Sequence, residues 1–167
     1  IWLKDYPDES TKFLKIAKVG KGTYGYVYKA HPKENPGIFY ALKKIKQDKE
    51  RDDGFPITAL REIQILQTLN HKNIIKLVTI STSKPAPQNK HRRSTYLVLD
   101  YMEHDFVSLL SRVTFNYCEI KCLMYQLLQG VDYLHTKNII HRDGKLVNIL
   151  VISSAKDEIL LGDFGLA

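Results

Sequence analysis

Few of the residues and segments that mark secreted or membrane proteins occur in this sequence. Its 167 residues include only two cysteines, which excludes a disulfide-rich scaffold and favours a reducing intracellular compartment. No stretch approaches 18 consecutive apolar residues, so neither a transmembrane helix nor a membrane partner is expected. Residues 1–5 lack an initiator methionine and are not followed by the apolar segment of a signal peptide. A fragment or a processed chain without a secretory signal is therefore expected.

The two cysteines, Cys118 and Cys122, lie four residues apart in a segment with helical periodicity. Neighbours on one helix face could share a metal ion, but no nearby histidine completes a set of zinc ligands. Reduced, half-buried helix cysteines are the favoured interpretation, and a zinc site is the alternative.

The composition is that of a folded domain, because 44% of the residues are hydrophobic and 26% are charged. The net charge of +7 is concentrated in part in two runs, 43–46 and 84–93. Such charge permits attraction to nucleic acid, anionic lipid or acidic substrates. Proline, glutamine and asparagine interrupt the second run, so we interpret it as a loop. Direct nucleic-acid binding is not expected, and binding through 90–93 is the alternative.

The first half of the sequence has the pattern of β-strands interrupted by one helix. β-Branched and aromatic residues favour strands at 13–19, 26–30 and 38–45, with a turn at 31–37. Pro56 fits the first turn of a helix, where its missing N–H costs nothing. The apolar residues that recur at helical spacing after it are Leu60, Ile63, Leu66 and Leu69. Two further apolar runs, 74–80 and 95–101, are expected to pair as strands across the basic loop.

The second half of the sequence changes period. A three-four spacing of apolar residues predicts a long amphipathic helix, with these residues at Ile120, Leu123, Met124, Leu127, Leu128, Val131 and Leu134. Two short runs, 149–152 and 159–161, are expected to form a hairpin. The change predicts an α+β fold with a seam near 102–105. The predicted parts are an extension at 1–12, a strand-rich lobe at 13–103 and a helical lobe at 104–167.

Three glycines between the first two predicted strands form the first candidate site. Gly20, Gly22 and Gly25 lack Cβ, so the surrounding backbone N–H groups could approach phosphate oxygens closely. A Gly-x-Gly-x-x-Gly pattern alone is weak evidence, because dinucleotide sites carry it between a strand and a helix. A second strand follows here, which disfavours a dinucleotide site.

Four polar positions extend this phosphate site. Lys43 would place positive charge at the α- and β-phosphates, and Glu62, on the following helix, would hold its ammonium in position. Asp143 is a candidate base or hydroxyl-orienting residue, and Lys145 could stabilise a transferred phosphoryl group. Each of these residues alone could be an ordinary surface residue. Only the ordered set of motifs favours the functional interpretation.

Two hard oxygen ligands complete the set. Asn148 and Asp163 carry the amide and carboxylate oxygens that Mg²⁺ prefers. A magnesium site is therefore predicted beside the triphosphate.

In this order and spacing, the motifs resemble those of the eukaryotic protein-kinase family over residues 13–167. The stretch 55–63 resembles the cyclin-binding helix of cyclin-dependent kinases, and 22–25 and 163–167 agree with that group. The stretch 101–105, with the insert at 81–94, is most similar to its transcription-associated branch. The resemblance implies a bilobal fold with a complete N-lobe and part of the C-lobe.

The resemblance also implies an activity and its partners. It implies an ATP-dependent Ser/Thr protein kinase that uses ATP and Mg²⁺ and transfers the γ-phosphoryl group to protein hydroxyls. Lys145 after Asp143 favours Ser/Thr over Tyr specificity. A cyclin would bind the helix around 56–69, and protein substrates would be phosphorylated. The location would be nuclear, with an additional cytoplasmic location as the alternative. Arg142 would meet a phosphate on an activation segment.

The resemblance further assigns the nucleotide-binding residues. Leu99 would be the gatekeeper, and Asp100 and Met102 would present hinge backbone groups to adenine. Thr23 and Tyr24 match positions of inhibitory phosphorylation, where added negative charge would oppose the ATP phosphates. The full implied nucleotide set is Val19, Gly20, Gly22, Gly25, Val27, Ala41, Lys43, Leu99, Asp100, Met102 and Leu150.

The sequence departs from the family pattern in two places. Gly144, Leu146 and Val147 stand where the family usually has Leu, Pro and Glu. Gly144 adds backbone freedom and Leu146 removes a restraint on φ, so looser positioning is expected. The sequence also stops two residues after Asp-Phe-Gly, so the 167-residue chain alone is expected to lack activity. A truncated, inactive kinase that captures cyclin or nucleotide as a decoy is the alternative function.

Overall fold

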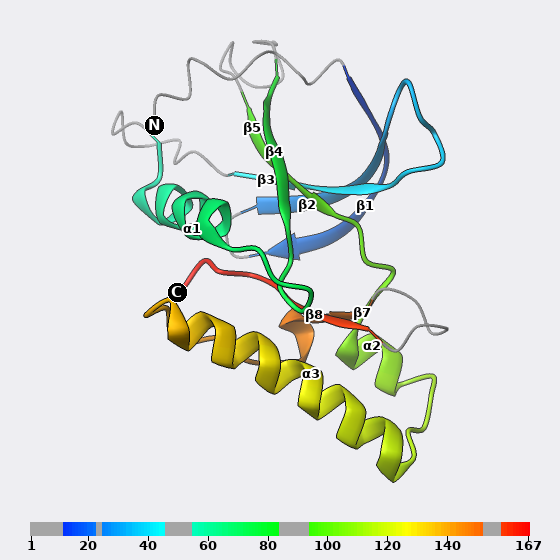
Figure 1. Cartoon of the computed structure of the whole chain (residues 1–167). Helices are drawn as coiled ribbons and strands as arrows, with labels where there is room; N and C mark the ends of the chain where they lie inside the picture. Colours follow the sequence, from blue (N-terminus) through cyan, green and yellow to red (C-terminus); the bar gives the residue numbers. More distant parts are fainter. Residues whose placement is uncertain (1–11, 23–24, 46–54, 84–93, 152–157) are drawn as a thin grey trace. The chain divides into compact units, whose positions relative to one another are not determined.

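The computed structural model describes residues 12–22, 25–45, 55–83, 94–151 and 158–167 (Figure 1). These residues form two compact units. The first unit contains the described residues up to Leu60 together with Leu77–Tyr101, and the second contains Arg61–Lys76 and Met102–Ala167. The predicted lobe limits of 13–103 and 104–167 stay a prediction.

The first unit is built on an antiparallel sheet of five strands in the order β1-β2-β3-β5-β4. The predicted strands are confirmed, with two shifted starts. The third begins two residues later than expected, because Ile38 donates its backbone N–H to the Asn35 carbonyl at 3.4 Å and so belongs to the preceding turn. The strands are β1 (Phe13–Gly22), β2 (Gly25–Pro32), β3 (Tyr40–Lys44), β4 (Leu77–Thr82) and β5 (Thr95–Asp100).

The strand predicted to start at Ile74 begins instead at Leu77. The residues before it find their backbone partners elsewhere, since Ile75 donates its N–H to Leu161 at 3.0 Å and Ile74 forms an isolated parallel bridge with the same residue. The expected pairing across the basic loop is confirmed, because β4 runs antiparallel to β5. The basic run 84–93 itself lies outside the described residues.

A small apolar cluster covers one face of this sheet. Ala30, Leu42, Tyr96 and Val98 are buried there, and Phe13, Tyr28 and Tyr40 pack against them. Phe13 and Tyr40 meet edge to face, with ring centroids 5.8 Å apart. The side chains of this cluster all lie on one face of the sheet, so they do not occupy its opposite face.

The predicted helix after Pro56 is confirmed as α1 (Ile57–Thr68). Leu60 donates its N–H to the Pro56 carbonyl at 3.1 Å, so the proline precedes the first hydrogen-bonded turn as its chemistry favours. The buried apolar residues recur at helical spacing, at Ala59, Ile63, Leu66 and, just beyond the helix, Leu69.

The second unit contains two α-helices besides the part of α1 that begins at Arg61. The long helix is confirmed as α3 (Tyr117–Thr136), and a capping box fixes its start. Asn116 Oδ1 accepts from the Glu119 N–H at 3.0 Å, while Glu119 Oε2 accepts from the Asn116 N–H at 2.7 Å. The short helix α2 (Phe106–Leu110), capped by Asp105, was not predicted. Each helix in the described ranges is too short or too polar to cross a bilayer.

The apolar residues of α3 divide between two environments. Leu123 and Leu134 are buried beside Gly130, whereas Ile120, Met124 and Leu128 are exposed. The expectation of half-buried cysteines is wrong, because Cys118 and Cys122 are both exposed. Both lie near the N-terminal end of α3, on the part of the helix that the second unit does not cover.

A small sheet in the second unit carries the end of the sequence. The predicted hairpin is confirmed as β7 (Ile149–Val151) and β8 (Ile159–Leu161), and β6 (His104–Asp105) adds a third strand that was not predicted. A 3₁₀ turn, η4 (Leu146–Asn148), leads into β7. Leu161 also donates to the Asn73 carbonyl at 2.9 Å, so the loop after α1 lies along β8.

Candidate active site

Strand register places the predicted base-contact residues on one face of the five-stranded sheet. Val27 lies opposite Lys43, and Ala41 lies opposite Leu99. Directly opposed residues of antiparallel strands present their side chains to the same face, and residues two apart in one strand do likewise. Val27, Ala41, Leu99 and Lys43 therefore share a face, and it is the face opposite the Ala30 and Leu42 cluster.

The glycines at the end of this face close the β1–β2 hairpin. Gly20 lies opposite Val27 and Gly22 lies opposite Gly25. Gly25 has φ 152°, a conformation that residues with a Cβ rarely adopt, so this position requires glycine. Val19, before them, has an exposed side chain. Thr23 and Tyr24 lie outside the described residues.

The predicted partners Lys43 and Glu62 are both buried. Lys43 belongs to the first unit and Glu62 to the second, and the ion pair between them stays a prediction. The implied hinge residues, Asp100 and Met102, are half-buried on either side of the boundary between the units. Leu150, in β7, is half-buried opposite Leu160 of β8.

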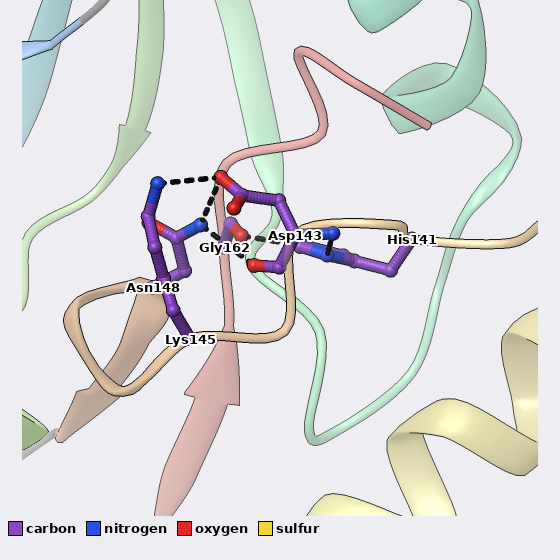
Figure 2. A network of polar contacts seen from close by, with 5 residues as sticks. All are labelled: His141, Asp143, Lys145, Asn148 and Gly162. Carbon is purple, nitrogen blue, oxygen red and sulfur yellow. Dashed lines mark hydrogen bonds and ion pairs between the residues drawn. The ribbon is translucent and has the colours of Figure 1, made fainter.

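The second unit brings together three of the predicted catalytic and metal residues (Figure 2). Asp143 Oδ2 forms an ion pair with Lys145 Nζ at 2.9 Å and accepts a hydrogen bond from Asn148 Nδ2 at 2.8 Å. Asn148 Nδ2 also donates to the Asp143 backbone carbonyl at 2.9 Å. The η4 turn fixes this geometry, because the Asn148 N–H donates to the Lys145 carbonyl at 2.9 Å. The carboxylate is thus held from two sides.

His141 links this loop to the last motif of the sequence (Figure 2). Its Nε2 lies 2.9 Å from the Gly162 carbonyl, and its Nδ1 lies 3.3 Å from the Asp143 N–H. A carbonyl can only accept and a backbone N–H can only donate, so Nε2 carries the proton and Nδ1 accepts. The Gly162 N–H in turn donates to the Asn148 carbonyl at 2.9 Å. Asp143 and Asp163 therefore stand on two loops that share hydrogen bonds.

Two residues flanking this junction adopt the left-handed conformation that side chains disfavour. Arg142 has φ 61° and Asp163 has φ 59°, and each such residue costs on the order of 1–3 kcal/mol. Phe164 holds the second turn in place, since it is only 1% exposed and packs edge to face on His141 with centroids 4.8 Å apart. Arg142 itself is exposed, and its contact with an added phosphate stays a prediction.

The neighbours of Asp143 and of Lys145 shift the pKa values of both side chains. The hydrogen bond from Lys145, followed by that from Asn148, holds the pKa of the Asp143 carboxyl below its ordinary value of 3.8. The bond to Asp143 raises the pKa of Lys145 in return, and the carboxylate of Asp163 adds to that effect. Asp143 is therefore ionised at neutral pH and is a weak base, which favours orientation of a hydroxyl over its full deprotonation.

The side-chain oxygens of Asn148 and Asp163 have the chemistry that a magnesium ion prefers. Both amide hydrogens of Asn148 are directed to Asp143, so its Oδ1 is the atom that a metal would use. Asn148 and Asp163 would supply two hard oxygens, and Mg²⁺ typically takes its other ligands from water and substrate phosphates. In the described ranges no group of three or more His, Cys, Asp or Glu residues could hold a metal by itself. Bound Mg²⁺ supplies positive charge that neutralises phosphate oxygens.

Gly144, which departs from the family pattern, stands at a position that does not require glycine. A Cβ added there would meet nothing within 4 Å, and the backbone of Gly144 lies outside the left-handed region. Leu146 and Val147 are both exposed. The departures from the family pattern therefore leave Asp143, Lys145 and Asn148 in contact.

We expect Gly144→Ala to stabilise the protein by about 0.4–1 kcal/mol, because alanine restricts the unfolded chain at a position where its Cβ fits. Denaturant unfolding of the natural-length protein, meaning the protein as it occurs in the cell, measures the change in the free energy of unfolding. Gly130→Ala is the matched control, because its Cβ would lie 3.2 Å from the Asn73 backbone oxygen and should destabilise. Equal destabilisation by both variants would show that Gly144 has a conformational role.

Sequence reasoning assigned no separate role to His141 or to Gly162. His141 was visible in its motif, but only the structure shows that both of its ring nitrogens are engaged. At Gly162, a Cβ would lie 3.1 Å from Leu150 Cδ1, so this position has little space for a side chain. Neither contact has a signature in local sequence, since the partners are separated along the chain.

Comparison with known proteins agrees with this geometry. The family model for the protein kinase domain matches residues 13–167. Cyclin-dependent kinase 9 of Rattus norvegicus is 48% identical over 163 residues, which cover 96% of this chain and 42% of the relative. Cyclin-dependent kinase 9 of Homo sapiens is 47% identical over 163 residues, with the same coverage of 96% and 42%.

A solved structure shows the same fold. One chain of the CAK complex from Chaetomium thermophilum, bound to ATP-gamma-S, has a TM-score of 0.79 and 35% sequence identity to this chain. The match covers 95% of this chain and 48% of that one. The predicted α+β kinase fold and the resemblance to cyclin-dependent kinases are thereby confirmed. The chain spans less than half the length of these relatives. Because the family model matches nearly all of the sequence, the chain belongs to the protein kinase domain family.

Proposed function

We propose that this protein is an ATP-dependent Ser/Thr protein kinase of the cyclin-dependent group. It transfers the γ-phosphoryl group of ATP to protein hydroxyls. The observation that carries the proposal is the Asp143 carboxylate, held by Lys145 and Asn148 on a loop that His141 joins to the turn of Asp163. Phosphoryl transfer needs a positioned acceptor and stabilised phosphate charge, and this loop offers groups for both.

Each side chain of the loop has a role in the proposed reaction. Oδ2 of Asp143 already accepts two hydrogen bonds, so Oδ1 is the atom assigned to accept a hydrogen bond from the acceptor hydroxyl and orient it. Lys145 lies beside that carboxylate and offers positive charge to the transferred group. Asn148 keeps Asp143 oriented through its amide hydrogens and would hold Mg²⁺ through its oxygen, together with Asp163.

The nucleotide is assigned to the face of the sheet that carries Val27, Ala41 and Leu99. Lys43, on the same face, would bind the α- and β-phosphates, and Glu62 would hold its ammonium. The glycines of the β1–β2 hairpin would bring backbone N–H groups to the phosphates. By the family resemblance, Leu150 would also contact the adenine base.

A cyclin partner, protein substrates and a nuclear location belong to the same proposal. One face of α1 is exposed, with Ile57 at 68% and with Arg61 and Gln64 at helical spacing from it. The cyclin is assigned to this helix because the stretch 55–63 resembles the cyclin-binding helix of cyclin-dependent kinases. The relatives are named cyclin-dependent kinases, and the transcription-associated branch that the sequence resembles supports nuclear work on transcription proteins.

We expect the natural-length protein to bind ATP with Mg²⁺, and Lys43→Met to weaken that binding by about 10–100-fold. A hydrogen bond to a charged group contributes about 1.5–3 kcal/mol, which corresponds to that range. Titration calorimetry measures the affinity. Lys44→Met is the control, because its side chain points to the other face of β3.

Equal affinity for ATP in both variants would contradict the phosphate role of Lys43.

A second measurement distinguishes the kinase from the inactive decoy. The natural-length protein, isolated with its cyclin, should transfer labelled phosphate to serine or threonine. Binding of cyclin without transfer of phosphate would contradict the kinase function and support the alternative, an inactive protein that captures cyclin as a decoy.

A further inference from the structure

One lysine on the sheet face assigned to the nucleotide, Lys29, contacts two aromatic rings. Lys29 Nζ lies 4.2 Å from the ring centroid of Phe39 and 4.5 Å from that of Tyr101. The two rings are 6.4 Å apart and inclined at 64°. We propose that Lys29 is a positioning residue that holds the adenine-binding hinge, an inference that rests on the proposed function.

Register places Lys29 in line with the nucleotide residues. It lies opposite Ala41 of β3, which lies opposite Leu99 of β5. These three side chains therefore share the face assigned to the base. Lys29 is the charged residue of this row, but its ammonium lies against aromatic rings next to the ends of β3 and β5.

The two rings belong to segments that the sheet alone does not hold. Phe39 stands just before β3, and Tyr101 stands just after β5. Tyr101 directly follows Asp100 and directly precedes Met102, the residues whose backbone groups are assigned to adenine. Phe39 remains 40% exposed, so burial alone does not fix it. The ammonium of Lys29 attracts both ring faces and so restrains the chain where it leaves the sheet.

The same sheet offers a comparison on its other face. Lys15 Nζ lies 4.1 Å from the ring centroid of Tyr96 and 4.8 Å from that of Tyr28. Lys15 lies opposite Ala30, the residue next to Lys29, so it points to the opposite face. Both lysines make a two-ring contact, but only the rings around Lys29 include a residue of the hinge.

The experiment uses the natural-length protein and three variants. Lys29→Met keeps the length of the side chain without its charge, Lys29→Arg keeps a cation that stacks on aromatic rings, and Lys15→Met is the matched control. Affinities for adenosine and for ATP with Mg²⁺ are measured by calorimetry. Hydrogen exchange of the backbone at 100–103 is measured without nucleotide.

We expect Lys29→Met to weaken the binding of adenosine and of ATP by the same factor, about three- to tenfold. The hinge would lose a restraint of the strength of a cation–π contact, and both ligands would then have to order it on binding. Exchange at 100–103 should accelerate. Lys29→Arg should restore affinity to within about twofold, and Lys15→Met should leave adenosine binding and hinge exchange unchanged.

Three results would overturn the positioning role alone while the unchanged protein binds ATP normally. The first is a loss of ATP affinity with adenosine affinity intact, which would place Lys29 at the phosphates. The second is unchanged exchange and affinity in Lys29→Met. The third is an equal loss in Lys15→Met, which would show general destabilisation of the sheet. Failure of the unchanged protein to bind either ligand would instead overturn the proposed function, and the positioning role with it.

Discussion

Replacing Asp143 with asparagine is expected to slow phosphoryl transfer by the natural-length protein about 10²–10⁴-fold, the usual contribution of a positioned acid–base group. Asparagine has nearly the same shape, but its neutral amide cannot form the ion pair that Lys145 makes with Asp143 Oδ2 at 2.9 Å. The side chain would also lose the negative charge that orients a hydroxyl. Single-turnover kinetics with saturating ATP measure the loss in the chemical step.

The affinity for ATP should change little in Asp143→Asn, because no contact with the nucleotide is assigned to Asp143. Asp132→Asn serves as the control, since Asp132 is exposed on α3 and its replacement should leave the rate unchanged. A rate for Asp143→Asn within a few-fold of the original would remove Asp143 from the role of hydroxyl-orienting residue.

Replacing Phe164 with alanine is expected to reduce the free energy of unfolding by about 3–5 kcal/mol, the range for truncating a buried aromatic residue. Phe164 is 1% exposed and packs on His141, so the variant leaves a cavity beneath the turn of Asp163. Urea unfolding of the natural-length protein, monitored by circular dichroism, measures the change.

Leu166→Ala is the matched control, because this neighbour is 50% exposed and its truncation should cost far less. Magnesium-dependent ATP binding should also weaken in Phe164→Ala, since the turn that presents Asp163 loses its anchor. Unfolding free energies that match within error for the two variants would show that Phe164 does not anchor this turn.

Regular elements with strong local signals were predictable from the sequence. The spacing of apolar residues identified α3, and Pro56 marked the start of α1. Strand positions followed from β-branched and aromatic runs, but their starts depended on competing hydrogen bonds. Asn35 holds Ile38 in a turn, and Leu161 takes the backbone of Ile75 away from β4. Leu161 lies far along the chain from Ile75, outside the window in which local patterns act, whereas Asn35 is a near neighbour of Ile38 and only shifts the boundary between turn and strand.

Short elements were missed because they carry too few residues for a period. The two-residue strand β6 and the five-residue helix α2 are examples. Burial of the two cysteines on α3 was also misjudged, since helical spacing identifies the apolar face of a helix but does not tell which part of the helix is covered. Ile120 and Met124 are exposed although they follow the same spacing as buried Leu123.

The candidate site shows the same division between local and distant information. Motif order was enough to select Asp143, Lys145 and Asn148, which the structure brings into direct contact. The tautomer of His141 depends on Gly162, 21 residues away, and was not readable from the motif. The contact of Lys29 with two aromatic rings likewise depends on Phe39 and Tyr101, which come from two other segments of the chain.

The loop after α1 also has a consequence for synthesis on the ribosome. Asn73 donates its side-chain amide to the Ile159 carbonyl, a residue 86 positions later in the chain. At about 5–20 residues per second, this partner is synthesised about 4–17 s after Asn73. During that interval the backbone groups of the loop have no β8 to bind. A run of slowly translated codons between these two positions would lengthen the exposure of the loop to chaperones and proteases without changing a single amino acid.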